Sequence, residues 1–314
     1  MLKMISYKGK GLFSLDMSSA EIAAEIFSHL EPEDFRVLMV IELDMSRHRY
    51  APEDDIFKLC NLPVKQVKYR LDRLSKFKLV HRWVGPYIGY ALSRAGYDCL
   101  AMNALVKANV IEALGKPLGV GKESDVYDAL SPEGRRLAVK FHRLGRISFR
   151  QTRRLRGYIA DRRHISWLYQ SRLAAEKEFE ALKIVYPHGV SVPEPIGQNR
   201  HVVVMGFIEG AELYRVPEVP DAEKVLDEIL ENVKRSYQKA EVIHADLSEF
   251  NVVLKPDGHI LIIDWPQFVR TDHPNAEMLL RRDLRNILRF FQKRFNVKRS
   301  LQEALNYIKA EEPP

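Results

Sequence analysis

Cysteine and long apolar segments are scarce in this sequence. Only two cysteines occur in 314 residues, Cys60 and Cys99, and they lie far apart without a metal-binding spacing. This scarcity argues against a disulfide framework and favours a reducing compartment. No apolar run approaches the ~18 residues of a membrane-spanning helix, and the segment from Met1 to Phe13 has too short an apolar core for a signal peptide. We therefore expect a cytoplasmic, monomeric protein with no membrane partner.

Acidic residues are nearly missing from one segment, residues 143–172. This segment holds nine arginines and one acid, Asp161, so its net charge of +8 exceeds the +7 of the whole chain. A basic block of this density is typical of proteins that contact polyanions. A solvated loop without a fixed ligand is the alternative interpretation.

The chain length predicts two domains, because a single core rarely grows beyond about 250–300 residues. In the first hundred residues, several segments with helical spacing of apolar positions precede an alternating stretch that glycine and proline interrupt. This order is typical of a winged helix-turn-helix domain, which we place at residues 1–92. The expected helices are residues 19–29, 32–43, 54–59 and 64–76, and the expected hairpin is residues 81–92.

The expected helix at residues 64–76 takes the recognition position of this domain. Its outer face is basic, and we expect nucleic-acid contacts from Lys65, Lys68 and Arg73. The first hundred residues carry a net charge of only about +2, from 15 basic and 13 acidic residues. A protein-docking surface therefore stays open as the alternative. The side chains expected to face inward are Val64, Val67, Leu71 and Leu74.

A connecting helix is expected at residues 93–112, and a glycine-containing turn between two strands follows it. Residues 118–127 read Leu-Gly-Val-Gly-Lys-Glu-Ser-Asp-Val-Tyr. Glycine lets the backbone approach a phosphate without a Cβ clash, and the serine hydroxyl could donate to a phosphate oxygen. The residues expected to contact ATP here are Gly119, Gly121, Lys122, Glu123, Ser124 and Val126.

A second nucleotide-binding signal follows this turn. Residues 137–140 read Leu-Ala-Val-Lys, which matches the V-A-I-K pattern of kinases and makes Lys140 a candidate phosphate ligand. A buried lysine needs a partner. Among the glutamates of the next helical segment, Glu178 lies nearest the apolar stripe, so we expect it to pair with Lys140. An ordinary surface glutamate is the alternative.

The apolar run that starts at His201 predicts a buried strand that leads into a linker. In a kinase-like fold, adenine binds to the backbone of such a linker. Met205 would lie at the back of that pocket, and the backbone of Gly206 and Ile208 would bind the base.

Three polar residues after this linker have the spacing of a phosphoryl-transfer site. Asp246 and Asn251 are five residues apart, and Asp264 follows thirteen residues later. On the ends of a short hairpin, their oxygens can converge on one point, which suits Mg²⁺ bound to nucleotide phosphates. Mn²⁺ could replace it. The spacing resembles H-R-D-x-x-x-x-N and D-F-G in kinases, so phosphoryl transfer is the leading hypothesis.

Taken together, the chain resembles the RIO family of atypical serine/threonine kinases, in the second subfamily, which carries an N-terminal winged helix. The resemblance implies an α+β fold with a compact bilobal kinase-like domain at residues 113–314, whose lobes span residues 113–205 and 209–314, and a flexible arginine-rich loop at residues 143–172. The motifs that carry it are Gly-Lys-Glu-Ser-Asp-Val-Tyr (121–127), Ala-Glu-Lys-Glu-Phe-Glu-Ala-Leu (175–182), His-Ala-Asp-Leu-Ser-Glu-Phe-Asn (244–251) and Ile-Asp-Trp-Pro-Gln (263–267).

The same resemblance implies a role for each site residue. Asp246 is the catalytic aspartate in the base position, Asn251 and Asp264 bind the metal, and Lys140 binds phosphates. Asp264 is also expected to become transiently phosphorylated, which would make it a nucleophile. ATP and Mg²⁺ are the implied cofactors. The family acts late in maturation of the small ribosomal subunit, so its precursor and its rRNA are the implied partners.

Two positions depart from the family pattern. Ala245 stands where glycine is more usual, which costs little if φ is negative there, and Gly206 stands where an acidic linker residue is more common. Because Gly206 would bind adenine through its backbone, we expect nucleotide binding to survive with a looser hinge.

The chain after Gln267 has only 47 residues, too few for the activation segment and helices that hold a peptide in ordinary protein kinases. This favours an ATPase or a self-phosphorylating switch. Within the arginine block, Ser148 is the candidate autophosphorylation site, where a phosphate would lower the positive charge. We expect Arg153, Arg154 and Arg156 to contact rRNA phosphates.

Two other functions stay open on the sequence alone. The first is a small-molecule phosphotransferase of the aminoglycoside-kinase type, which shares a similar catalytic loop but should have a larger C-terminal lobe with an acidic pocket. The second is an RNA-binding assembly factor whose kinase site only senses ATP.

Overall fold

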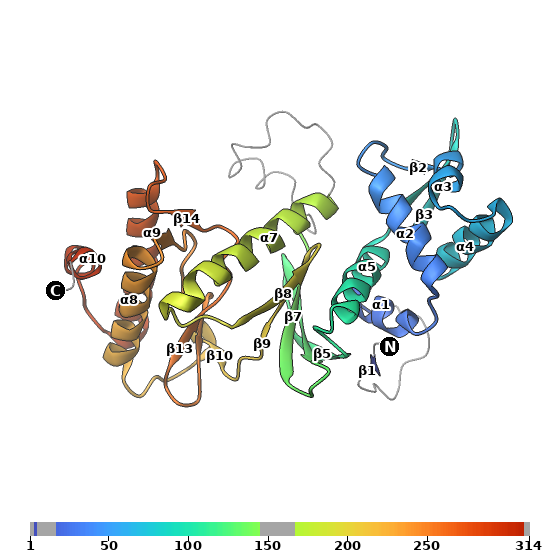
Figure 1. Ribbon diagram of the computed structural model, residues 1–314. Helices are drawn as coiled ribbons and strands as arrows, with labels where there is room; N and C mark the ends of the chain where they lie inside the picture. Colours follow the sequence, from blue (N-terminus) through green and yellow to red (C-terminus); the bar gives the residue numbers. More distant parts are fainter. Residues whose placement is uncertain (1–2, 5–16, 145–166, 311–314) are drawn as a thin grey trace. The chain divides into compact units, whose positions relative to one another are not determined.

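Figure 1 shows the chain as a computed structural model, which describes residues 3–4, 17–144 and 167–310. The chain divides into two compact units. One contains residues 1–171 with 199–202, and the other contains residues 172–198 with 203–314. Helices and sheets occur in both, as the α+β prediction requires. Within the described ranges, no helix is both long enough and apolar enough to cross a membrane.

The first unit begins with the predicted winged helix-turn-helix arrangement. Its first helix starts with a reciprocal cap, because the Ser18 hydroxyl accepts from the Glu21 N–H (3.1 Å) and the Glu21 carboxylate accepts from the Ser18 N–H (2.8 Å). A three-stranded sheet of order β2-β4-β3 forms the wing. The elements are α1 (Ser19–Phe27), α2 (Pro32–Asp44), β2 (Ala51–Pro52), α3 (Glu53–Leu59), α4 (Val64–Lys76), β3 (Val80–Val84) and β4 (Ile88–Leu92).

Helix α4 packs on this domain through three of the four residues predicted to face inward. Val67, Leu71 and Leu74 are fully buried, whereas Val64 is 49% exposed. The prediction was therefore wrong for Val64. It is the first residue of α4, so no preceding turn of helix covers it, and it sits at the edge of the packed face.

Helix α5 (Arg94–Lys107) follows the wing and packs closely on it. The Ser93 hydroxyl accepts from the Gly96 N–H at 3.1 Å and caps the helix. A Cβ at Gly96 would lie only 2.1 Å from the carbonyl oxygen of Leu79, so glycine is required for this approach. The helix therefore joins the winged helix firmly to the strands that follow.

Those strands form a sheet in which β1, β5, β6 and β7 are successive neighbours. The outermost strand comes from the start of the chain, because Lys3 pairs in parallel with Ala113. The predicted winged-helix boundary of 1–92 was thus wrong at its beginning, since residues 3–4 join this second sheet. The strands are β1 (Lys3–Met4), β5 (Ala113–Val120), β6 (Ser124–Leu130) and β7 (Arg136–His142).

The second unit holds the remaining helices and several small sheets. In it β12 lies between β10 and β13 and β11 pairs with β14, whereas the neighbouring strands β8 and β9 each have residues in both units. Helix α7 starts at Trp167, so the predicted arginine-rich loop ends before residue 172. The elements are α7 (Trp167–Val185), β8 (Pro195–Asn199), β9 (Val202–Gly206), β10 (Ala211–Glu212), α8 (Ala222–Gln238), β11 (Val242–Ile243), β12 (Val252–Leu254), β13 (Ile260–Ile262), β14 (Val269–Arg270), α9 (Ala276–Phe295) and α10 (Leu301–Lys309).

A buried charge network holds the first unit together. The Arg143 guanidinium donates to both oxygens of Asp98 (2.6 and 2.9 Å) and to Asp125 (2.9 Å), and all three side chains are fully buried. His201 lies 2.7 Å from the same Asp98 carboxylate. Burial alone would raise the pKa of Asp98, but the charge of Arg143 and the bond from His201 hold it well below its usual range.

This network corrects one interpretation of the arginine block. Arg143 was counted among the arginines of a flexible loop at residues 143–172 that contacts polyanions, yet its side chain is 0% exposed. It joins α5, β6 and the end of β7, so it cannot reach an external ligand.

We predict that Arg143→Gln lowers the free energy of unfolding by about 3–5 kcal/mol, because it leaves two buried carboxylates without their cation. Urea unfolding measures the change. Arg136→Gln is the matched control, since Arg136 pairs with Asp128 across neighbouring strands at 3.1 Å but is 51% exposed. That control should cost less than about 1 kcal/mol. Equal losses in the two variants would contradict the assignment.

Candidate active site

The predicted catalytic segment lies in the second unit, between β11 and the β12–β13 hairpin. Its turn is closed by the Asn251 N–H, which donates to the Ser248 carbonyl at 3.0 Å. The Asn251 side-chain nitrogen donates to the Asp246 carbonyl, and the Ile263 N–H donates to the Asn251 carbonyl, both at 2.9 Å. These bonds tie Asn251 to Asp246 and to the residue before Asp264. The structure thus brings together the three backbone positions that the spacing predicted.

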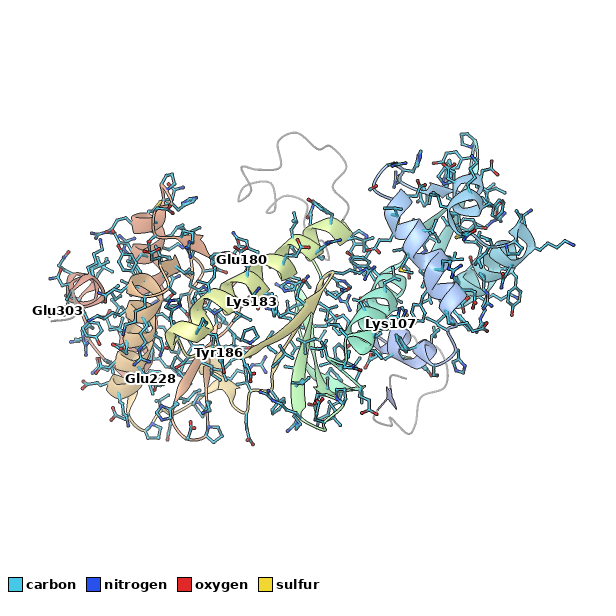
Figure 2. All side chains as sticks on the ribbon, viewed as in Figure 1. Lys107, Glu180, Lys183, Tyr186, Glu228 and Glu303 are labelled. Atoms are coloured by element: carbon cyan, nitrogen blue, oxygen red, sulfur yellow. The ribbon has the colours of Figure 1, made fainter. Side chains whose placement is uncertain are left out.

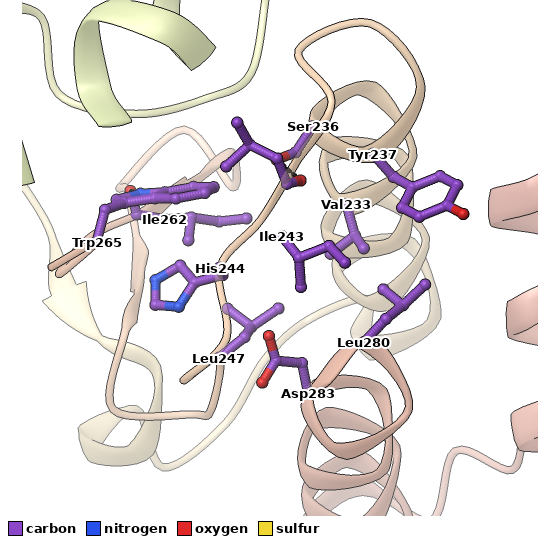
Figure 3. Close-up of a pocket in the computed structure, with 11 residues that line it drawn as sticks. Val233, Ser236, Tyr237, Ile243, His244, Leu247, Ile262, Trp265, Leu280 and Asp283 are labelled. Carbon is purple, nitrogen blue, oxygen red and sulfur yellow. Dashed lines mark hydrogen bonds between the residues drawn. The ribbon is translucent and has the colours of Figure 1, made fainter. Parts of the chain in front are cut away.

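His244 has a positioning role in this segment. Its side chain is buried, and its Nε2 lies 3.0 Å from the Ile263 carbonyl oxygen, which can only accept, so Nε2 is the protonated nitrogen. The imidazole packs against Trp265 with ring centroids 4.5 Å apart. Trp265 in turn donates from Nε1 to the Ile262 carbonyl at 3.1 Å. Figure 3 shows this packing beside Leu247.

Helix α9 clamps the same segment from the other side. The Ala245 N–H donates to Asp283 Oδ2 at 2.7 Å, and the Arg282 guanidinium donates to the Ala245 carbonyl. Asn286, one turn further along, donates to the Leu247 carbonyl at 3.1 Å. In Figure 3 the Asp283 carboxylate points from α9 toward Leu247.

The sequence interpretation missed Asp283 and Asn286. One signal was available. Asp283 stands among Leu280, Leu284 and Ile287, the apolar positions that α9 buries, and a lone acid on a buried face needs a specific partner.

Two residues of the segment adopt the left-handed backbone conformation. Ala245 has φ of +60° and Asp264 has φ of +68°. The expectation that alanine costs little at residue 245 depended on a negative φ, and it was wrong. A left-handed residue with a Cβ costs roughly 1–2 kcal/mol. The bonds to Asp283 and Arg282 hold Ala245 in this conformation.

The polar side chains of this site fit a hard cation. Asp246 is exposed, Asp264 is half-buried, and Asn251 is 9% exposed. The amide nitrogen of Asn251 is bonded to Asp246, so its amide oxygen is the atom that can ligate. The Asp264 carboxylate and the Asn251 amide oxygen are donors of the kind that Mg²⁺ takes together with phosphate oxygens, and Asp246 is in the base position.

The glycine turn and Lys140 lie in the first unit. The Gly121 N–H donates to the Ser124 carbonyl at 2.8 Å and closes the turn between β5 and β6. A Cβ at Gly119 would meet nothing within 4 Å, so the space above this strand is open. Lys122 and Glu123 are exposed, whereas Ser124 and Val126 are half-buried. Lys140 is buried on β7 opposite Val126, as the V-A-I-K pattern requires.

The other predicted nucleotide residues lie in the second unit. On α7, Glu178 is 2% exposed, Glu176 pairs with Arg172 at 2.7 Å, and Glu180 lies on the exposed side with Lys183 (Figure 2). Helical periodicity thus identified the buried glutamate correctly, and its pairing with Lys140 stays a prediction. Met205 is buried at the end of β9. The Gly206 N–H donates to Glu194 at 2.9 Å, so only its carbonyl can contact a base. Ile208 is half-buried in the linker that follows.

The structure corrects one predicted nucleic-acid contact. Arg73 donates to Glu31 at 2.6 Å and is only 19% exposed, so its charge is already neutralised. The bonds from Arg70 and Arg73 lower the pKa of Glu31 to about 2. Lys65 and Lys68 are exposed, as expected. Ser148, Arg153, Arg154 and Arg156 lie outside the described residues.

Comparison with known proteins identifies this arrangement. Residues 125–304 match the model of the RIO domain, and residues 27–108 match the Rio2 N-terminal domain. The chain belongs to the RIO family. Its winged helix places it in the Rio2 subfamily, and it is an atypical serine/threonine-protein kinase that uses ATP and Mg²⁺. This identification removes the small-molecule phosphotransferase alternative.

Three relatives show how far the similarity extends. The RIO-type serine/threonine-protein kinase Rio2 of Methanocaldococcus jannaschii is 48% identical over 79% of this chain and 92% of its own length. The rio2 kinase of Schizosaccharomyces pombe is 37% identical over 86% of this chain and 78% of its own. The crystal structure of the Chaetomium thermophilum Rio2 kinase, an ADP/Mg²⁺-phosphoaspartate complex, is 35% identical with a TM-score of 0.78, covering 91% of this chain and 89% of that one.

We predict that stability depends on pH through Asp283. Burial raises the pKa of this carboxyl to about 7 from a usual value of 3.8. Between these values the folded state binds a proton that the unfolded state has lost, so stability falls as pH rises from about 4 to 7, by at most about 1.4 kcal/mol per pH unit. Asp283→Asn keeps an acceptor for the Ala245 N–H but does not titrate. In urea unfolding at several pH values, its advantage over the parent should grow up to about pH 7. A difference that does not vary with pH would contradict this account.

We predict that Ala245→Gly raises the free energy of unfolding by about 1 kcal/mol, because glycine removes the Cβ strain at φ of +60°. Thermal or urea unfolding measures the change. The control is Ala304→Gly inside α10, where an ordinary helical backbone should make the same substitution destabilising by roughly 1 kcal/mol. If both Ala245→Gly and Ala304→Gly lower the free energy of unfolding, the Cβ of Ala245 does not strain the backbone.

Proposed function

We propose that this kinase acts as an ATP-driven switch on the precursor of the small ribosomal subunit, with Asp264 as a transient phosphoryl acceptor. The observation that carries the proposal is the position of Asp264. It follows directly on the residue bonded to Asn251, and it is half-buried with a left-handed backbone, beside an exposed Asp246. The relative from Chaetomium thermophilum holds ADP, Mg²⁺ and phosphoaspartate, which supports the same chemistry here.

The first step is transfer to Asp264. An oxygen of its carboxylate attacks the γ-phosphorus of ATP, the bond from that phosphorus to the bridging oxygen of ADP breaks, and the electron pair leaves with ADP. An acyl phosphate and ADP are the products. Bound Mg²⁺, held by Asn251 and Asp264, would neutralise charge on the phosphates. Lys140 and the glycine turn would supply further phosphate contacts, and Glu178 would orient Lys140.

The second step is release. Asp246, which is exposed on the same segment, accepts a proton from an attacking water, and the bond between phosphorus and the Asp264 oxygen breaks. Inorganic phosphate leaves and the carboxylate is restored. Because the acyl phosphate persists until water attacks, its lifetime can time a step on a bound particle.

The basic surfaces support a ribonucleoprotein partner. The arginine block and the exposed Lys65 and Lys68 are suited to rRNA phosphates. We further propose that the protein acts as a monomer in the cytoplasm, and that self-phosphorylation at Ser148 lowers the affinity of the arginine block for rRNA.

We predict that single-turnover reactions with γ-labelled ATP give a base-labile, hydroxylamine-sensitive phosphoprotein in the parent and none in Asp264→Asn.

Asp246→Asn should slow ATP turnover by at least about a hundredfold while changing ATP affinity little, because general-base catalysis is worth about 10²–10⁴-fold. Asp257→Asn is the control, since Asp257 lies in the exposed β12–β13 turn and is 51% exposed. A hydroxylamine-sensitive label that survives in Asp264→Asn would overturn the acceptor assignment.

A further inference from the structure

A groove lies directly beside the catalytic segment, within the second unit. One wall comes from the chain between Asp246 and Asn251, and the other comes from the second half of α9. Its volume of about 580 Å³ lies within the roughly 300–1,000 Å³ typical of ligand-binding pockets. We call it the basic groove. It is lined by Ser248, Glu249, Phe250, Asn286, Arg289, Phe290, Lys293 and Arg294.

Helix α9 carries a row of three cations, of which Arg289 and Lys293 line the groove. Arg285, Arg289 and Lys293 follow one another at four-residue spacing, so they lie along one stripe of the helix about 6 Å apart. Like charges at this spacing destabilise a helix. Among the residues the structure describes, these three form no ion pair, whereas Arg281 pairs with Glu277 at 2.6 Å on the same helix.

The other charged residues of the groove do not neutralise these cations. Arg294 is exposed and donates to the Pro217 carbonyl at 3.4 Å, and no carboxylate within the described part of the chain pairs with it. Glu249 is the one acid among the lining residues, so the lining carries three cations against one anion. A polyanion would therefore relieve repulsion between the cations when it binds.

The opposite wall offers aromatic surface. Phe250 is 54% exposed, and its ring centroid lies 4.8 Å from that of Tyr214, which is 37% exposed. The Arg215 guanidinium lies 5.2 Å from the Tyr214 ring. Phe290 adds a half-buried ring on the α9 side. Exposed aromatic rings beside spaced cations are the combination that binds single-stranded nucleic acid, by base stacking and phosphate pairing together.

We propose that the basic groove binds a single-stranded RNA segment against the catalytic loop. The proposal rests on the ribonucleoprotein partner given under the proposed function and places one contact of that partner at a site distinct from the arginine block and from α4. An acidic peptide would use the cations alone, whereas RNA would also use the exposed Phe250 and Tyr214 rings.

The groove also has a physical connection to catalysis. Asn286 lines the groove and donates to the Leu247 carbonyl, and Ser248, on the other wall, accepts the Asn251 N–H. RNA in the groove therefore contacts two residues that fix the catalytic loop. We expect bound RNA to change the rate of ATP turnover.

The test uses the full chain and a fluorescently labelled twelve-nucleotide oligouridine, with binding followed by anisotropy across a salt series. The double substitution Arg289→Gln/Lys293→Gln should weaken binding at least tenfold and lower the slope of log affinity against log salt by about 1.4, or roughly 0.7 for each lost phosphate contact. Phe250→Ala should weaken binding about five- to hundredfold without changing that slope, because stacking is worth about 1–3 kcal/mol per base.

Arg281→Gln is the matched control, because Arg281 is on the same helix but is ion-paired with Glu277 outside the groove. It should leave both the affinity and the slope unchanged. ATP turnover without RNA should match the parent in Arg289→Gln/Lys293→Gln and Arg281→Gln, and thermal unfolding should show no loss of stability in these two variants. In the parent, saturating oligouridine should change ATP turnover, and Arg289→Gln/Lys293→Gln should lose that response.

Three results would overturn the proposal. The first is a salt slope and affinity that do not differ between Arg289→Gln/Lys293→Gln and Arg281→Gln. The second is an undiminished affinity in Phe250→Ala. The third is that oligouridine binds only outside the groove, while polyglutamate binds in the groove and loses affinity in Arg289→Gln/Lys293→Gln. The acceptor role of Asp264 is tested separately. If Asp264 is not the acceptor, the parent forms no acyl phosphate on it, but oligouridine binding and its dependence on Arg289 are unchanged.

Discussion

The active-site segment depends on one buried carboxylate. Asp283 is almost completely buried on α9, and it accepts the N–H of Ala245, whose left-handed backbone turns the chain so that Asp246 becomes exposed. Without an acceptor at that point, the Ala245 N–H would be buried and unpaired, which costs about 1–3 kcal/mol. Arg282 satisfies the Ala245 carbonyl from the same helix. The catalytic aspartate is therefore positioned through the backbone of its neighbour.

In the first unit, too, one buried charged side chain satisfies buried polar groups from several elements, but here it is a cation. Arg143 is fully buried and satisfies two carboxylates, Asp98 of α5 and Asp125 of β6. Asp125 lies next to Ser124 of the glycine turn, and Asp98 belongs to the helix that follows the winged helix. The strands that carry Lys140 are thereby joined to α5 by directional bonds as well as by apolar packing. Buried charges of this kind fix geometry more than they add stability, because desolvation offsets most of their attraction.

Local spacing predicted most of the site. Asp246, Asn251 and Asp264 flank one short hairpin, so their proximity follows from the sequence. Glu178 was identified because helical periodicity is also local. The features that were missed depend on distant partners. Asp283 bonds to a residue 38 positions away, and Arg73 to one 42 positions away. Arg143 was counted as a loop cation because composition does not reveal that its partners are Asp98 and Asp125. The φ of Ala245 could not be foreseen for the same reason, since bonds from α9 impose it.

Helix α9 therefore has two faces with separate tasks on the same segment. Its buried face, through Asp283, fixes the backbone before Asp246, and its exposed face, through Arg289 and Lys293, forms one wall of the basic groove. Asn286 lies between these faces and contacts both the groove and the loop. A ligand that draws the cations of α9 toward it acts on the helix that holds Ala245 in its strained conformation. Because two bonds from α9 hold the strained backbone of Ala245, small movements of that helix change its conformation. A polyanion bound to α9 can therefore change the rate of phosphoryl transfer.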